Sequence, residues 1–350
     1  MQSKLVDIED FYYSDNPYDV LKFYTKFNSA EELVKWMKTR PRAPISFHEI
    51  EGDTDVIVVI PTADVNNKYA KGDLEMYNGL HIIFCESSGK YFNYATSVNT
   101  CVKEAMKYNP EWIIFSNDDV YKIDEPSVLK KELGKFDYKD PNTILPVGKN
   151  YKFVKSEIRV LKPTIIKGYR NCLLGGLSLL KGKFSGRYPK NFDISLIWFL
   201  ARAQIYYNSL LRKFNLPFLD LRVASTDTIS YKARYLMERA LGEYINNFYI
   251  KKFGDFGGFS RGYLNKFGTN IFDETFINGV ENYDLSLQLL WKKIPVNIIN
   301  YRKGSYKGRS LGLGLNNKGV SRTIRSFSNF IYMAYKNLDN LVKKDAIDSL

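Results

Sequence analysis

The sequence has few of the side chains that bind transition metals, with three cysteines and two histidines among 350 residues. Cys85, Cys101 and Cys172 lack the close paired spacing of a zinc site. An odd number of thiols without such spacing predicts buried, unpaired cysteines in a reducing compartment. His48 stands alone in a polar stretch, where a histidine is more often a surface residue than a ligand.

The chain also has no long apolar segment. Its first residues, MQSKLVDIEDFYY, include early acidic residues and no apolar run of the kind found in signal peptides. The longest nearly uncharged apolar run, 194–201, is far too short to cross a bilayer. We therefore expect a cytoplasmic protein, and peripheral contact with a membrane stays open.

Two common nucleotide-binding motifs are missing as well. The strongest strand signal, 55–60 (DVIVVI), runs into PTADVN and not into the G-x-G-x-x-G loop of dinucleotide-binding folds. No G-K-[ST] occurs at a strand-to-helix turn, as a P-loop would require. Both absences argue against these two classes of nucleotide-binding protein.

Basic residues outnumber acidic residues in the chain. The formal net charge is +13, which implies an anionic partner such as nucleic acid, an anionic membrane or a phosphorylated small molecule. The basic residues are spread through expected helices and loops without a nucleic-acid-binding motif, which disfavours a nucleic-acid binder. At this length the chain can bury a sizeable core in one large domain or two close ones.

The order of expected elements is strand, strand, helix, strand. Strands are expected at 55–60, 81–85 and 112–115, with a helix at 93–107 and a further strand at 142–147. This order predicts an α/β fold with a doubly wound, mostly parallel sheet flanked by helices. Near-continuous apolar strands indicate that both faces of the sheet are buried.

One expected strand ends in a pair of carboxylates. The apolar run 112–115 is followed by SNDD at 116–119. Open α/β sheets bind ligands at the carboxyl ends of their strands, and two hard oxygen ligands favour a divalent cation that holds phosphates. The alternative interpretation of Asp118 and Asp119 is a polar turn before a helix at 125–133.

The order and spacing of four segments resemble the GT-A-fold glycosyltransferases, most closely the large family 2 of nucleotide-sugar enzymes. These segments are DVIVVIPT, IIFCESSG, NYATSVNTCVKEA and WIIFSNDDV. The family has a P-T turn after the first strand, an acidic residue after the second, A-x-x-x-N in the helix and a D-x-D-type motif last. Asn117 replaces the first Asp of that motif, while Asp119, at the position that usually binds the metal, is retained.

A second block, starting at DFGGFSRGYLNKF (255–267), resembles the G-G/A strand of the family and continues into an F-D-E-x-F turn. GVENYDL (279–285) then resembles the G-x-E-D-x-D/E-L segment that opens the helix under the acceptor. Glu281 and Asp284 are three residues apart and share a helix face. Asn282 occupies the place of the usual catalytic base. The alternative interpretation is a pair of acidic residues that stabilise the helix dipole.

The resemblance implies a glycosyltransferase that moves a sugar from a nucleoside-diphosphate sugar to an acceptor hydroxyl. Mn²⁺ or Mg²⁺ would be bound by Asp119 with help from Asp118. Because an amide cannot take a proton, we expect Glu281 first, and Asp284 second, to be the base of an inverting reaction. A retaining reaction stays open, because an E-N pair also occurs at this site in retaining enzymes of this fold.

The resemblance also implies a donor-binding pocket that encloses the base, the ribose and the diphosphate. Its expected residues are Pro61, Thr62, Glu86, Lys90, Asn93, Asp118, Arg302 and Lys303. Arg302 and Lys303 open a basic, glycine-rich segment, 301–325, that we expect to close over the diphosphate. No histidine lies in this segment, so a third metal ligand of the kind that some enzymes of this fold supply is missing.

The expected organisation has five parts. They are a helical N-terminal segment (1–50), a nucleotide-sugar-binding half (51–150), a largely helical insertion (151–253), an acceptor or catalytic half (254–300), and a basic flexible loop with a C-terminal helix (301–350). Within the insertion, the helix expected at 192–219 is either buried, with a homodimer contact as one option, or lies on an anionic membrane. The acceptor class stays open between a glycan, a lipid-linked molecule and a protein.

Three other functions remain as alternatives. A sugar-1-phosphate nucleotidyltransferase shares the fold, but would carry a glycine-rich basic loop where this chain has PTADVN. A non-enzymatic nucleic-acid binder is conceivable from the charge. An inactive scaffold is conceivable because Asn117 and Asn282 stand where the family has carboxylates.

Overall fold

The computed structural model describes residues 7–12, 23, 26–27, 29–147, 253–306 and 320–337. These residues fall into two compact units. The described residues up to Trp36 and those of 320–337 belong to one unit, and 37–147 with 253–306 belong to the other. Within these described ranges, no helix is long and apolar enough to cross a membrane.

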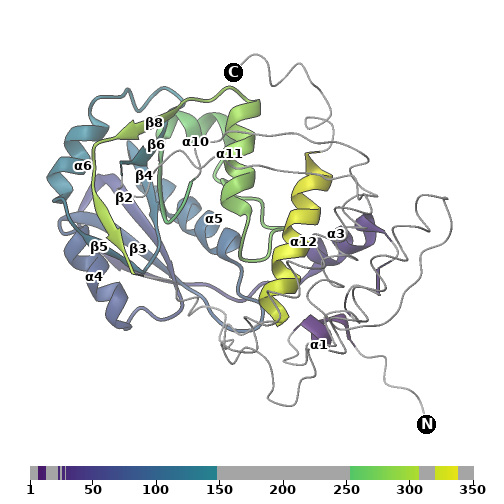
Figure 1. Cartoon of the computed structure of the whole chain (residues 1–350). Coiled ribbons are helices and arrows are strands. Elements are labelled where there is room, and N and C mark those ends of the chain that lie inside the picture. Colours follow the sequence, from purple (N-terminus) through teal and green to yellow (C-terminus); the bar gives the residue numbers. More distant parts are fainter. Residues whose placement is uncertain are drawn as a thin grey trace, which may run out of the picture. The chain divides into compact units, whose positions relative to one another are not determined.

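The larger unit is built on a mixed sheet of seven strands, in the order β1-β3-β2-β4-β7-β6-β8 (Figure 1). Strands β3, β2 and β4 run parallel, as do β6 and β8, whereas β1 and β7 run antiparallel to their neighbours. The predicted α/β class is thus confirmed, in a mixed sheet. The strands are β1 (Ser46–Ile50), β2 (Asp53–Thr62), β3 (Leu80–Glu86), β4 (Trp112–Ser116), β6 (Thr143–Pro146), β7 (Phe256–Ser260) and β8 (Val296–Ile299).

Helices cover both faces of this sheet, as the apolar strands predict. Figure 1 shows the helices on either side of the sheet. Ile57 and Val59 of β2 belong to a core that includes residues of α5, α10 and α11, while Val58 and Ile60 belong to a core with α4 and α6. All four side chains are fully buried. The helices are α4 (Lys68–Met76), α5 (Tyr94–Ala105), α6 (Pro126–Leu133), α10 (Arg261–Phe267) and α11 (Glu281–Trp291).

The glycine pair of β7 lies where neighbouring side chains leave no space. A Cβ atom on Gly257 would lie 2.3 Å from the Phe115 ring, and one on Gly258 would lie 2.4 Å from Ile144. Side chains from the adjacent strands β4 and β6 therefore fill the volume over both glycines. The G-G segment is explained here by packing.

The prediction of unpaired cysteines is wrong for two of the three. Cys85 in β3 and Cys101 in α5 form a disulfide, with Cα atoms 5.9 Å apart. Both lie in the same core, where α5 packs against β3. Their 16-residue separation resembles no metal motif, and the pairing follows from helix-on-strand packing that spacing alone does not reveal. Cys172 lies outside the described residues.

Two segments differ from the predicted organisation. Ser46–Ile50 lies at the end of the part named a helical N-terminal segment (1–50), but it forms strand β1, which pairs antiparallel with β3. The segment 301–325 was expected to be a flexible loop, yet Lys303–Ser305 forms β9, which pairs with β5 (Val120–Lys122) in a separate two-stranded ribbon. Val320–Lys336 form helix α12.

The smaller unit contains α1 (Ile8–Tyr12), most of α3 (Ala30–Thr39) and α12 (Val320–Lys336). The rings of Tyr12, Phe23, Phe27 and Trp36 pack together in it. The Ser29 hydroxyl caps the start of α3, since it accepts the Glu32 backbone N–H at 3.3 Å. Helix α12 lies within 301–350, where a C-terminal helix was expected. The helix expected at 192–219 lies outside the described residues.

Candidate functional site

The carboxyl ends of the parallel strands β2, β3 and β4 meet at one edge of the sheet. The Thr62 hydroxyl, at the end of β2, donates a hydrogen bond to Asp118 Oδ2 at 2.7 Å. The turn after β2 and the Asp118 carboxylate after β4 are therefore in contact at the edge where open α/β sheets bind ligands. Pro61 is buried in the same strand end.

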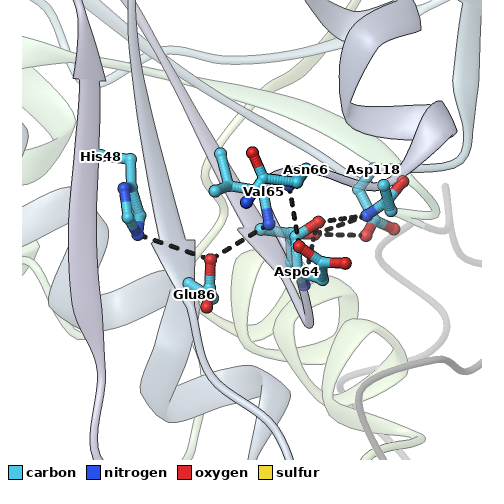
Figure 2. A network of polar contacts seen from close by, with 8 residues as sticks. His48, Asp64, Val65, Asn66, Glu86 and Asp118 are labelled. Atoms are coloured by element: carbon cyan, nitrogen blue, oxygen red, sulfur yellow. Dashed lines mark hydrogen bonds and ion pairs between the residues drawn. The ribbon is translucent and has the colours of Figure 1, made fainter.

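The loop after β2 folds back onto Thr62 through Asn67. The Asn67 side-chain oxygen caps α4 by accepting the backbone N–H groups of Tyr69 and Ala70. Its amide nitrogen donates to the Thr62 hydroxyl at 3.2 Å and to the Asp64 carbonyl. Figure 2 shows this loop between Glu86 and Asp118. One residue thus fixes both the helix start and the strand end.

Glu86, at the end of β3, is held from two sides (Figure 2). Its Oε2 atom accepts the Val65 backbone N–H at 3.1 Å and lies 3.4 Å from His48 Nε2. His48 lies on the exposed strand β1, and its sequence context predicts an ordinary surface residue. Only the antiparallel pairing of β1 with β3 places it beside Glu86, and no local pattern predicts that pairing.

Several carboxylates influence one another electrostatically beside the β4–β5 turn. Burial raises the pKa of Asp119 to about 6, and the neighbouring charges of Asp118 and Asp255 contribute. Burial also raises the pKa of Asp118, although the Thr62 hydroxyl partly offsets this effect. We refer to Asp73, Asp118, Asp119 and Asp255 as the acidic cluster.

Asp73 belongs to this cluster and was missed in the sequence. It lies on α4, is fully buried, and neither carboxyl oxygen has a hydrogen-bond partner. Burial, followed by the charges of Asp118 and Asp119, raises its pKa to about 9. The available signal was a carboxylate at an apolar position of a helix, between the buried residues Ala70 and Met76.

Lys303 is paired within the cluster. Its ammonium Nζ lies 2.7 Å from Asp255 Oδ1 and 3.2 Å from the Ser305 hydroxyl, which itself donates to Asp255 Oδ2. Burial would raise the pKa of Asp255, but Lys303 and Ser305 bring it below its ordinary value. Burial also lowers the pKa of Lys303, against the opposing attraction of Asp255, Asp119 and Asp73.

Three other expected donor-binding residues are engaged within the chain. Arg302 forms a two-pronged ion pair with Asp124, through Nε at 3.0 Å and Nη2 at 2.6 Å from Oδ1. Asn93 caps α5 and donates to the Phe276 carbonyl at 2.7 Å. Lys90 is exposed, and its Nζ lies 5.4 Å from the centre of the Tyr91 ring. Phosphate contact by these residues stays a prediction.

Tyr94 connects the sheet edge with the start of α11. Its hydroxyl donates to Asn117 Oδ1 at 2.8 Å. Burial raises the pKa of Tyr94, and the charge of Glu281 is the next largest cause, ahead of those of Asp255 and Asp118. Asp284 is also buried, about one turn further along the helix.

The backbone that presents Glu281 is strained. Glu281 Oε2 accepts the Gly279 backbone N–H at 2.6 Å. Val280, which immediately precedes α11, has φ 75° and ψ −18°. The left-handed region is rare for a β-branched residue, and such outliers cluster at functional sites. Helix α11 therefore begins directly after a valine whose backbone conformation is unfavourable for a β-branched side chain.

Two carboxylates of the site, Asp118 and Asp119, match the ligands that a divalent cation takes in proteins. In the described ranges, no three His, Cys, Asp or Glu side chains form a group that could hold a metal ion by themselves. Mg²⁺, however, is usually bound through one or two carboxylates and completes its shell with water and substrate phosphates. Asp118 and Asp119 fit that pattern.

The fold and the site define an α/β protein with a carboxylate-rich site at the carboxyl edge of its parallel strands. No family model matches the chain, and no match is found among curated proteins or solved structures.

Proposed function

We propose that this protein is a GT-A-type glycosyltransferase that transfers a sugar from a nucleoside-diphosphate sugar to an acceptor hydroxyl. The hydrogen bond between Thr62 and Asp118 is the main support, because it joins the two segments whose motifs resemble that family. Glu86 ends the adjacent parallel strand, where a carboxylate can accept hydrogen bonds from a ribose or a base. The nucleoside and the diphosphate of the donor would then lie side by side along one edge of the sheet.

Asp118 and Asp119 are the residues proposed to bind the cation. A divalent cation there, Mn²⁺ or Mg²⁺, would neutralise the charge that develops on the leaving diphosphate. Asp118 is oriented for this by Thr62, which occupies Oδ2. The backbone carbonyl of Asp119 accepts the Tyr306 N–H at 2.8 Å, so the turn is fixed on the side of β9 as well.

Glu281 is the proposed base if the reaction inverts the anomeric configuration. The bond from Gly279 fixes the carboxylate at the start of α11, and its charge acts on the Tyr94 hydroxyl, which donates a hydrogen bond to Asn117. If the reaction retains the configuration, the leaving phosphate can take the proton and Glu281 would orient the substrates. NMR of the product anomer separates the two cases. A Glu281→Gln variant that keeps most of its activity would remove the base assignment.

A thermal-shift screen tests the proposal directly. The purified protein is heated with UDP, GDP, CDP or ADP, each with and without Mn²⁺ or Mg²⁺. A ligand that binds only the folded state at about 100 times its dissociation constant stabilises it by about 2.7 kcal/mol. We expect one nucleotide to raise Tm by several degrees, with a larger rise when the metal is present.

Two variants make the screen specific. Asp119→Asn should lose the metal-dependent part of the shift and the metal-dependent hydrolysis of the matching nucleotide-sugar. Asp55→Asn is the matched control, because Asp55 is exposed near the opposite end of β2. The proposal fails if no nucleotide stabilises the wild-type protein under any metal condition, or if Asp119→Asn responds like the control.

A further inference from the structure

The ammonium of Lys303 is buried among carboxylates. Its side chain is 4% exposed, whereas that of the preceding Arg302 is 65% exposed. Asp255 is its direct partner, and Asp119 and Asp73 also act on it electrostatically. A lysine is almost never buried unless it is paired. The acidic cluster therefore has a resident positive charge supplied by the chain itself.

The β5–β9 ribbon fixes where this charge lies. β5 begins at Val120, directly after Asp119, and its antiparallel register pairs Lys122 with Lys303 and Tyr121 with Gly304. At Gly304 a Cβ atom would lie only 1.9 Å from the Tyr121 ring, so the ring packs directly onto the β9 backbone. Lys303 and Asp119 are thus connected through a short paired ribbon and not through a loose loop.

Asp73 provides a second observation, because the cluster contains a buried carboxyl group whose oxygens are left for a further ligand. Its carboxyl group is fully buried, and its oxygens have no hydrogen-bond partner in the described part of the chain. An unpaired polar group at such a position is costly unless a further ligand, ion or water satisfies it. Asp118, Asp119 and Lys303 are the charges that act on it.

We propose that the Lys303 ammonium is the built-in counter-ion of the acidic cluster and competes with a divalent cation for the carboxylate of Asp119. A univalent and a divalent positive charge repel each other strongly in a partly buried site. In the empty protein, Lys303 therefore weakens divalent-ion binding. A further inference rests on the proposed function: a bound diphosphate supplies the Lys303 ammonium with a new anionic partner. The metal and the nucleotide therefore bind together.

Direct measurement of Mn²⁺ binding tests this competition without any assay of activity. Free Mn²⁺ is followed by electron paramagnetic resonance during titration of the full-length protein in the absence of nucleotide. We expect Lys303→Met to bind Mn²⁺ at least about tenfold more tightly than the wild type. Lys122→Met is the matched control, since Lys122 lies opposite Lys303 in the ribbon but pairs with Glu125 at its surface. It should change Mn²⁺ affinity less than twofold.

Lys303→Gln guards against loss of folding, because a glutamine amide can still donate a hydrogen bond to Asp255. It should also tighten Mn²⁺ binding, while Lys303→Arg should not. Thermal unfolding identifies variants that fail to fold. Unchanged or weaker Mn²⁺ binding in a folded Lys303→Met or Lys303→Gln protein overturns the proposal, as does an equal effect of Lys122→Met.

Repeating the titration with the nucleotide found in the screen separates this inference from the proposed function. We expect the nucleotide to tighten Mn²⁺ binding to the wild type by more than it does in Lys303→Met. If no nucleotide binds any variant, the glycosyltransferase proposal fails while the competition at the cluster is still decided by Mn²⁺ alone. If nucleotide and Mn²⁺ bind but Lys303→Met has unchanged Mn²⁺ affinity, the competition fails and the proposed function stands.

Discussion

Replacing Asp73 by asparagine should stabilise the protein, in a way that depends strongly on pH. The folded state raises the pKa of Asp73 to about 9, from an ordinary value of 3.8. Above pH 3.8 the unfolded chain loses this proton and the folded protein keeps it, so the folded state is disfavoured increasingly up to about pH 9. At pH 7 the difference of about three pH units corresponds to about 4 kcal/mol, and at pH 5 to about 2 kcal/mol.

Urea denaturation of the wild type and Asp73→Asn at pH 5, 6, 7 and 8 measures this effect. The gain in unfolding free energy should grow by about 1.4 kcal/mol per pH unit. Glu75→Gln is the control, because Glu75 is exposed on the same helix and should change stability by less than about 0.5 kcal/mol. A gain that does not vary with pH, or a loss of stability at pH 7, would show that the folded protein holds Asp73 ionised and paired.

Two further predictions concern the packing of the larger unit. Gly258→Ala should destabilise this unit by about 1–3 kcal/mol in urea denaturation, because the new methyl group would overlap Ile144 in the core. Gly72→Ala in helix α4 is the control. A Cβ atom there would lie 3.7 Å from its nearest neighbour, so this change should be neutral or stabilise by up to about 1 kcal/mol. Equal effects would contradict the close approach at β7. Reduction of the Cys85–Cys101 bond, which spans 16 residues, should lower unfolding free energy by about 3 kcal/mol. A Cys85→Ala/Cys101→Ala protein whose stability still responds to reductant would point to another cause.

The parts of the fold that were predictable are those encoded in short stretches. β2 is an almost unbroken run of β-branched residues, and the predicted helix at 93–107 appears as α5, capped by Asn93. The position of Asp118 and Asp119 followed from one rule, because a parallel strand delivers the residues after it to the ligand-binding edge. The contact between Thr62 and Asp118 agrees with that expectation.

The parts that were missed depend on pairings between distant segments. His48 reaches Glu86 only because β1 joins the sheet antiparallel to β3. Lys303 is buried only because β9 pairs with β5, more than 180 positions earlier in the sequence. A single basic residue in a glycine-rich segment has the same local pattern whether it is solvated or buried, so its role could not be read from its neighbours. Asp73 does have a local signal, a carboxylate at an apolar position of helix α4, but a single residue of this kind is too weak a pattern to predict a site.

The position of the long segment 148–252 between β6 and β7 has a consequence for protein engineering. β6 and β7 are adjacent and antiparallel, with Thr143 opposite Phe259 and Ile144 opposite Gly258. Antiparallel neighbours can be joined by a hairpin of a few residues. The sheet therefore does not need the intervening residues to connect its strands. The register therefore allows these two strand ends to be joined by a short turn in a shortened chain that keeps the residues of the sheet edge.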